Sequence, residues 1–264
     1  MKNFKQELKI RGYSKKTIEA YLHYNEKFLL FCKKPALNIT NQDIKDYIEY
    51  LIDKKLAKNT IRLAYNALQF YYTKFLGKKL MKNIKLPKRD QKTIICLTKE
   101  EVTLLIDSIK NSKHKLLVEL LYGSGLRVSE VVKLKVGDVL VDEKILIIRA
   151  GKGNKDRKVI ISKKFLDDFP RYKTPESYLF PGRNAHLTIR SVQEILKQAA
   201  NKTGISKNIH PHLLRHSFAT HLLNNEVDLR KIQKLLGHKS IKTTEKYLHI
   251  SDKDIKNVKS PLDY

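Results

Sequence analysis

The chain has 264 residues, 41% of them hydrophobic, which is enough to bury the cores of two compact domains. Its 54 Lys and Arg residues face only 27 Asp and Glu residues, giving a formal net charge of +27. That excess predicts a polyanionic partner, although a solvated lysine-rich surface or an anionic membrane surface would also carry it. The sequence has neither an apolar run long enough to span a membrane nor the apolar core of a signal peptide, so we expect a cytoplasmic protein.

Residues 1–76 predict a small helical bundle. Ser14 is a candidate N-cap for one helix. Thr40 opens a second helix with Asp43 three residues later, which is a variant of the capping box. A third helix ends at Gly77. Apolar residues recur in these stretches near the helical period, so each helix has one face suited to a core.

A basic segment follows the bundle. Residues 77–97 contain Pro87 and lack helical periodicity, which predicts a linker before a second domain at 98–264. Residues 1–97 hold 22 basic and 8 acidic residues, whereas residues 98–264 hold 32 and 19. The first third of the chain therefore carries about half of the excess charge, as expected of a DNA-gripping module.

The second domain is predicted to be mainly helical with a small β-hairpin, so the fold class is α+β with a separate N-terminal bundle. Thr98 and Glu101 form a capping box at its first helix. The β-type runs 145–148 and 158–161 flank a glycine-rich turn and predict the hairpin. Further helices are expected over residues 113–122, 188–203, 212–225, 228–236, 240–247 and 251–258.

Four islands of the second domain carry residues suited to phosphodiester cleavage. Arginines can bind the oxygens of a phosphorane-like transition state, a tyrosine hydroxyl can attack in line, and a lysine can protonate the leaving oxygen. Histidines can donate hydrogen bonds or act as a base near neutral pH. The candidates are Arg127 in GSGLRVSE, Lys152 in GKGNKDR, His212 and Arg215 in HPHLLRH, His238 in LLGH, and Tyr247.

Each candidate taken alone also has an ordinary structural explanation, such as a surface arginine or a solvated turn lysine. His212 and His216 have a spacing found in metal sites, but the glutamate of an HExxH motif is missing and no cysteine or carboxylate cluster supplies further ligands. The GKG turn lacks the spacing of a phosphate-binding P-loop. Neither a metal nor a nucleotide cofactor is therefore predicted. Cys32 and Cys96 are expected to be free thiols.

The order of these islands resembles the catalytic domain of the tyrosine recombinases, also called the phage integrase family, and is most similar to its Xer-type members. The resemblance covers nearly the whole chain, because the N-terminal helices resemble the SAM-like core-binding domain of that family. It is carried by SGLRVSE, GKGNKDR, HPHLLRHSFATHLL, LLGH and the tyrosine nine residues after that histidine.

The resemblance implies a role for each position. Tyr247 would be the nucleophile, and Lys152 the general acid, with Lys155 a competing lysine in the same turn. Arg127 and Arg215 would clamp the phosphate, with His212 and Arg215 forming the HxxR pair of the family. His238 would fill the position held there by His or Trp, and Glu130 would support the site. The implied set is Arg127, Lys152, His212, Arg215, His238 and Tyr247, with Glu130 in support.

The resemblance further implies a site-specific recombinase that needs neither ATP nor a metal ion. It would act on double-stranded DNA through a 3′-phosphotyrosyl intermediate and a Holliday junction. A tetramer on two DNA sites is expected, built from this chain alone or with a paralogous recombinase, and its expected task is the resolution of chromosome dimers. The alternatives are a mobile-element integrase, a type IB topoisomerase-like enzyme, and a non-catalytic architectural DNA-binding protein.

Overall fold

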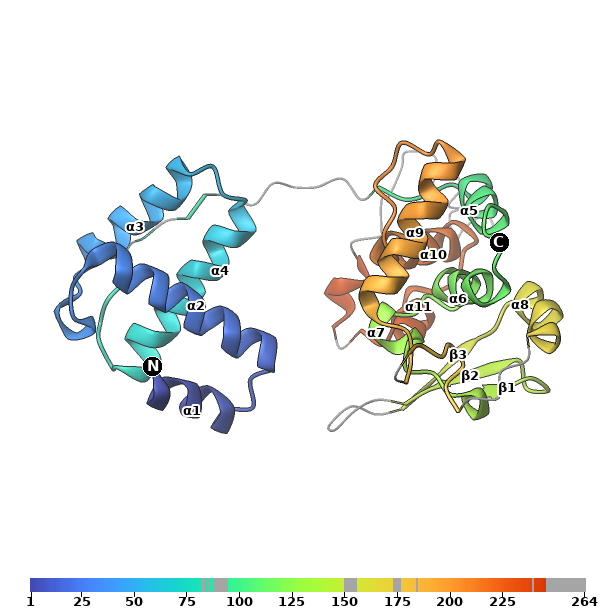
Figure 1. Cartoon of the computed structure of the whole chain (residues 1–264), viewed down its shortest axis with the longest axis horizontal. Coiled ribbons are helices and arrows are strands. Elements are labelled where there is room, and N and C mark those ends of the chain that lie inside the picture. The colour runs from blue at the N-terminus through green and yellow to red at the C-terminus, as the bar shows by residue number, and fades with distance from the viewer. Residues whose placement is uncertain are drawn as a thin grey trace, which may run out of the picture. The chain divides into compact units, whose positions relative to one another are not determined.

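The computed structural model of the chain describes residues 1–81, 84, 86–87, 95–149, 156–172, 177–183, 185–238 and 240–245. The chain forms two compact units, Met1–Lys92 and Thr93–Tyr264 (Figure 1). Among the described residues, none of the helices has the length and apolar character needed to cross a bilayer.

The first unit is a bundle of helices. Its elements are α1 (Lys2–Ile10), α2 (Lys15–Cys32), a 3-10 turn (Ala36–Asn38), α3 (Asn41–Asp53), α4 (Lys58–Gln69) and a π-helical turn (Phe70–Phe75). Aromatic rings fill the centre, where Phe28 packs edge-on against Tyr47 and Tyr72. The periodic apolar faces of the sequence therefore meet in one core. Met81, from the segment predicted as a linker, is also buried in this core.

The predicted caps of this unit are present. Ser14 Oγ accepts a hydrogen bond from the amide of Thr17 at the start of α2. At α3 the Thr40 amide donates to Asp43 Oδ2 over 2.8 Å, while the Asp43 amide donates to Thr40 Oγ1 over 3.3 Å. The short aspartate thus completes a reciprocal capping box and fixes where α3 begins.

The second unit contains most of the elements. They are α5 (Lys99–Asp107), α6 (Ser112–Gly123), α7 (Val128–Val131), a 3-10 turn (Val136–Asp138), β1 (Val139–Leu140), β2 (Ile145–Ile148), β3 (Arg157–Ile160), α8 (Lys163–Asp168), a 3-10 turn (Phe169–Arg171), α9 (Ile189–Thr203), α10 (Pro211–Asn224), α11 (Leu229–Leu236) and a 3-10 turn (Ile241–Thr243). The strands lie together at one end of this unit, with α8 beside them (Figure 1). Thr98 and Glu101 form the predicted capping box of α5.

The small sheet has the order β1-β2-β3 and is antiparallel throughout. Ile145 pairs with Ile160 and Ile148 pairs with Arg157, so the two predicted β-type runs do pair. The residues of the turn between them, 150–155, lie outside the described residues. β1 was not predicted, because two residues carry no periodic signal and form a strand only beside β2.

Two helices of the prediction need correction or fall outside the described residues. A helix was expected over 240–247, but the described part forms only a 3-10 turn at Ile241–Thr243. The hydroxyl of Thr244 lies 2.9 Å from His238 Nδ1, which holds the end of this turn against the residue that follows Gly237. The helix expected over 251–258 lies outside the described residues. The short helix α8 was not predicted.

Candidate active site

The first island forms a turn that follows α6 and lies against two other elements. Ser124 Oγ donates a 2.7 Å hydrogen bond to the carbonyl of Ile160 at the end of β3. Gly125 has a φ of +59°, and a Cβ there would lie 2.3 Å from a ring carbon of Phe218 in α10. Only glycine combines this backbone conformation with such a close approach. The turn therefore brings the next residues of the chain directly onto α10.

Arg215 of α10 is buried and binds this turn. Only 3% of the residue is exposed. Its Nη1 donates to the carbonyl of Gly125 over 2.7 Å, and its Nη2 donates to the carbonyl of Leu236 over 2.5 Å. A lysine could not place donors on both carbonyls, because the ammonium lacks the planar fork of a guanidinium. Arg215 thus joins the turn after α6 to the end of α11.

Arg127 lies at the start of α7 and reaches the same end of α11. Its Nη2 donates to the carbonyl of Gly237 over 3.2 Å, one residue along from the carbonyl that Arg215 binds. Its Nη1 pairs with Glu130 Oε1 at 2.8 Å. The side chain of Arg127 is 36% exposed, so part of the guanidinium faces solvent. The two predicted phosphate-binding arginines therefore meet at one turn of the chain.

Glu130 holds this cluster together. Its carboxylate accepts from the backbone amide and the guanidinium of Arg127, and from both terminal nitrogens of Arg157. Burial alone would raise the pKa of this carboxyl, but the hydrogen bonds from Arg157 and from the amide of Arg127 lower the pKa to about 2. Glu130 is therefore ionised at any physiological pH.

Sequence reasoning gave Arg157 no role, although it stands at the end of the GKGNKDR island. It is the first residue of β3, and the residue pattern of the island alone does not show which side chains turn towards Glu130. Its position directly before the predicted β-type run 158–161 was the one available indication, because alternate residues of a strand face opposite sides of the sheet.

His238 follows Gly237, which ends α11 with a φ of +61°. Its Nδ1 lies 2.9 Å from Thr244 Oγ1. Burial first, and then the charges of Arg215 and Arg127, lower the pKa of this imidazole to about 4. The ring is therefore neutral at pH 7. If Nδ1 accepts from the threonine hydroxyl, the proton sits on Nε2, which can donate to a ligand.

His212 lies in α10 one turn before Arg215, and its side chain is exposed. Its ring centroid is 6.5 Å from that of His216. The structure thus groups Arg127, Glu130, Arg215 and His238 by direct contact or by charge, while His212 lies on α10, the helix that carries Arg215. Within the described part of the chain, no three His, Cys, Asp or Glu residues are grouped as metal ligands.

Lys152 and Tyr247 lie outside the described residues, so their roles stay predictions. The chain nevertheless limits where they attach. Lys152 precedes β3, which begins at Arg157, and Tyr247 follows Thr244, which contacts His238. In the sequence, Lys152 is thus five residues from Arg157 and Tyr247 is three residues from Thr244.

The cluster has an excess of positive charge. Three guanidinium groups, those of Arg127, Arg157 and Arg215, surround the end of α11, and the carboxylate of Glu130 is bonded to the first two of them. The nearby His238 is neutral. Such a site favours a dianionic or monoanionic oxygen ligand such as a phosphate group.

Comparison with known proteins agrees with this chemistry. Residues 96–254 match the phage integrase family, and residues 1–82 match the phage integrase N-terminal SAM-like domain. The first match spans more than half of the chain and contains all the candidate residues.

Individual relatives cover almost the same span. The tyrosine recombinase XerA of Pyrococcus horikoshii is 37% identical over 97% of this chain and 90% of its own length. The putative integrase/recombinase y4qK of Sinorhizobium fredii is 36% identical over 98% of this chain and 86% of its own length. Among solved structures, the Tn1549 transposon integrase in complex with a circular intermediate DNA shares the fold at 19% identity, with a TM-score of 0.77 over 96% of each chain. The chain belongs to the phage integrase family and is a tyrosine recombinase.

Proposed function

We propose that this enzyme is a site-specific recombinase whose cluster of arginines binds the scissile phosphate of double-stranded DNA. One observation carries the proposal: Arg127 and Arg215, which are 88 positions apart in the sequence, donate to the adjacent carbonyls of Gly237 and Leu236. Because the two guanidinium groups bond to consecutive peptide units, we expect both to bind the non-bridging oxygens of a single phosphate.

The chemistry follows from these positions. The hydroxyl of Tyr247 attacks phosphorus, the new bond joins the tyrosine oxygen to the 3′ phosphate, and the bond to the 5′ oxygen breaks. Lys152 donates the proton that the leaving 5′ oxygen takes up. Arg127 and Arg215 hold the oxygens that gain charge, and neutral His238 adds a hydrogen bond. His212 is assigned as the base that takes up the proton released by the hydroxyl of Tyr247.

Strand exchange completes the proposal. The free 5′ hydroxyl of one duplex attacks the phosphotyrosine of the other, which restores the tyrosine and forms a Holliday junction after the first pair of exchanges. Because the phosphotyrosyl bond conserves the energy of the broken phosphodiester, the cycle consumes no ATP. We assign the work to a tetramer on two DNA sites in the cytoplasm, made of this chain or of this chain and a paralogous recombinase.

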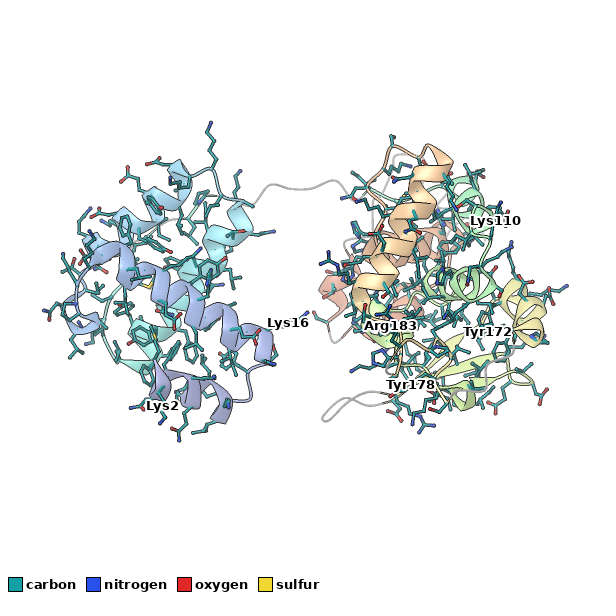
Figure 2. All side chains as sticks on the ribbon, in the orientation of Figure 1. Lys2, Lys16, Lys110, Tyr172, Tyr178 and Arg183 are labelled. Carbon is teal, nitrogen blue, oxygen red and sulfur yellow. The ribbon has the colours of Figure 1, made fainter. Side chains whose placement is uncertain are left out.

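DNA as the partner is supported by charge as well as by family. The net charge of +27 is spread over both units. Lys2 and Lys16 in the first unit and Lys110 in the second are exposed, and all three extend from their ribbons (Figure 2). Contacts between exposed lysine side chains and DNA phosphates supply an affinity for DNA that falls steeply as the salt concentration rises. The Tn1549 relative was solved with DNA bound.

The biological task has two candidates. Resolution of chromosome dimers is favoured by the identity to XerA over nearly the full length of both chains. Integration of a mobile element is the second candidate, favoured by the relative described as an integrase/recombinase and by the fold shared with a transposon integrase. The bound DNA separates them: recovery of a chromosomal site favours dimer resolution, and recovery of the ends of a mobile element favours integration.

Covalent trapping tests the reaction. Tyr247→Phe is first used to select the bound genomic fragments, and the recovered site is made as a nicked suicide substrate. Wild type is expected to give a denaturant-resistant protein–DNA band, and so is the control Tyr178→Phe, whereas Tyr247→Phe gives none. Binding by all three proteins without any trapping would contradict the proposal and leave an architectural role. Relaxation of supercoiled DNA without strand exchange would indicate topoisomerase-like activity.

A further inference from the structure

Arg157 connects three elements of the site through all three nitrogens of its guanidinium. Its Nη1 and Nη2 donate to the two oxygens of Glu130 over 2.9 and 2.8 Å. Its Nε donates to the carbonyl of Leu235 over 3.1 Å. The arginine therefore joins the first residue of β3 to α7 and to the end of α11.

We propose that Arg157 is a positioning residue for strand cleavage: it fixes the carboxylate that holds Arg127 and the turn that holds both phosphate-binding arginines. This inference rests on the proposed recombinase function. Leu235, whose carbonyl Arg157 binds, directly precedes the two residues whose carbonyls accept from Arg215 and Arg127. A displacement of Arg157 would thus also displace Arg127 and Arg215, because one or two hydrogen bonds connect it to the groups that hold them.

The partners and the surroundings of its guanidinium distinguish Arg157 from a phosphate ligand. Both of its terminal nitrogens donate to one carboxylate in a parallel fork, whereas those of Arg215 donate to neutral backbone carbonyls. Its flank is also covered, because a Cβ on Gly237 would lie 3.0–3.2 Å from Cδ, Nε and Cζ of Arg157.

The electrostatic consequence concerns Arg127. Glu130 is ionised, and its negative charge is shared between two guanidinium groups. Without Arg157, the carboxylate would have Arg127 as its remaining guanidinium partner and would draw that side chain out of position. The positive charge available to bind a phosphate would fall at the same time. Arg157 therefore maintains the phosphate binding of Arg127 without contacting it.

The same residue anchors the hairpin that carries the predicted general acid. Arg157 pairs with Ile148, and this is the pair of the β2–β3 ladder nearest in sequence to Lys152. Its bonds to Glu130 and Leu235 tie this end of the hairpin to the site. One side chain therefore sets the position of both the phosphate-binding groups and the hairpin base.

The test compares the rate of covalent-complex formation with DNA affinity, using the full-length protein and the nicked substrate selected with Tyr247→Phe. At saturating DNA, Arg157→Gln is expected to form the covalent complex about 100-fold more slowly than wild type, the loss typical of a catalytic group misplaced by about 1 Å. The DNA dissociation constant is expected to stay unchanged, which also shows that the variant is folded. Arg149→Gln is the matched control on the neighbouring strand end, because that arginine is 64% exposed and pairs with Asp138.

Two further variants keep the inference open to refutation if Arg157→Gln does not fold. Arg157→Lys retains the charge but not the fork, and is expected to remain slow. Adding Arg157→Gln to Glu130→Gln is expected to slow the reaction little beyond Glu130→Gln alone, since the arginine acts through that carboxylate. Wild-type rates in Arg157→Gln or Arg157→Lys, or fully additive losses in the double variant, would overturn the inference. If wild type itself forms no covalent complex, the proposed function fails instead.

Discussion

Replacing Gly125 with alanine probes the contact on which the site is built. The residue has a φ of +59°, and its carbonyl accepts the hydrogen bond from Arg215. The added Cβ would lie 2.3 Å from a ring carbon of Phe218, far inside the separation of about 3.5–4 Å at which carbon atoms attract. We expect Gly125→Ala to lower both the stability of the second unit and the rate of DNA cleavage.

The magnitude follows from three effects. A left-handed conformation costs a residue with a Cβ about 1–2 kcal/mol. The reduced entropy of the unfolded chain offsets about 0.4–1 kcal/mol of this. Phe218 is 5% exposed and packs against Ile232 and Leu236, so its ring has little room to move, and overpacking of this kind costs about 1–3 kcal/mol. The free energy of unfolding should therefore fall by about 1–5 kcal/mol.

Gly204→Ala is the matched control in the same unit. Gly204 has a φ of +67°, but no atom lies within 4 Å of a Cβ placed there, so the variant carries the conformational cost alone. Hydrogen exchange of the amides of α6 and α10 in the full-length protein measures the opening free energy of this unit. The difference between the two variants should be about 1–3 kcal/mol, which isolates the contact with Phe218.

Equal costs for Gly125→Ala and Gly204→Ala would refute the reasoning, because the steric contact would then contribute nothing. A second check is Phe218→Leu in the Gly125→Ala background. The smaller side chain should recover part of the stability, giving a coupling free energy of about 0.5–3 kcal/mol between the two positions.

Three other predictions concern Arg215, His238 and Glu119. Arg215→Lys leaves one of two buried carbonyls without its donor, so we expect a loss of about 1–3 kcal/mol in stability, and a fall of about 10²–10³-fold in single-turnover cleavage measured on quenched gels. His238 has a pKa of about 4 against an ordinary 6.5, so wild type should lose stability as the pH falls through this window; urea titrations of His238→Gln should show a smaller loss. Glu119 is 3% exposed, and neither carboxyl oxygen has a hydrogen-bond partner in the described structure; burial, followed by the charge of Asp168, raises its pKa from 4.5 to about 7. The stability of wild type should therefore fall as the pH rises from 4.5 to above 7, because the buried carboxyl must then ionise. Glu119→Gln should be more stable than wild type at pH 8 and similar to it near pH 4.5. A wild type that is no less stable than Glu119→Gln at pH 8 would contradict this.

The local features of the fold can be predicted from the order of residues alone. The N-caps at Ser14, Thr40 and Thr98 are made by residues three positions apart, so the pattern of neighbours is sufficient to predict them. The long amphipathic helices and the pairing of the two β-type runs followed from periodicity for the same reason. The islands of Arg, Lys, His and Tyr identified the family, which the matches over residues 1–82 and 96–254 confirm.

Tertiary structure decided how these pieces meet. The bond from Arg215 to Gly125 spans 90 positions, and that from Arg157 to Glu130 spans 27, so no local pattern encodes either. β1 exists only because β2 lies beside it, and the segment after Ser240 departs from a helix as Thr244 meets His238. Side-chain types can be read along a chain, but the shared use of a carboxylate or a carbonyl depends on distances that are set when the whole unit packs.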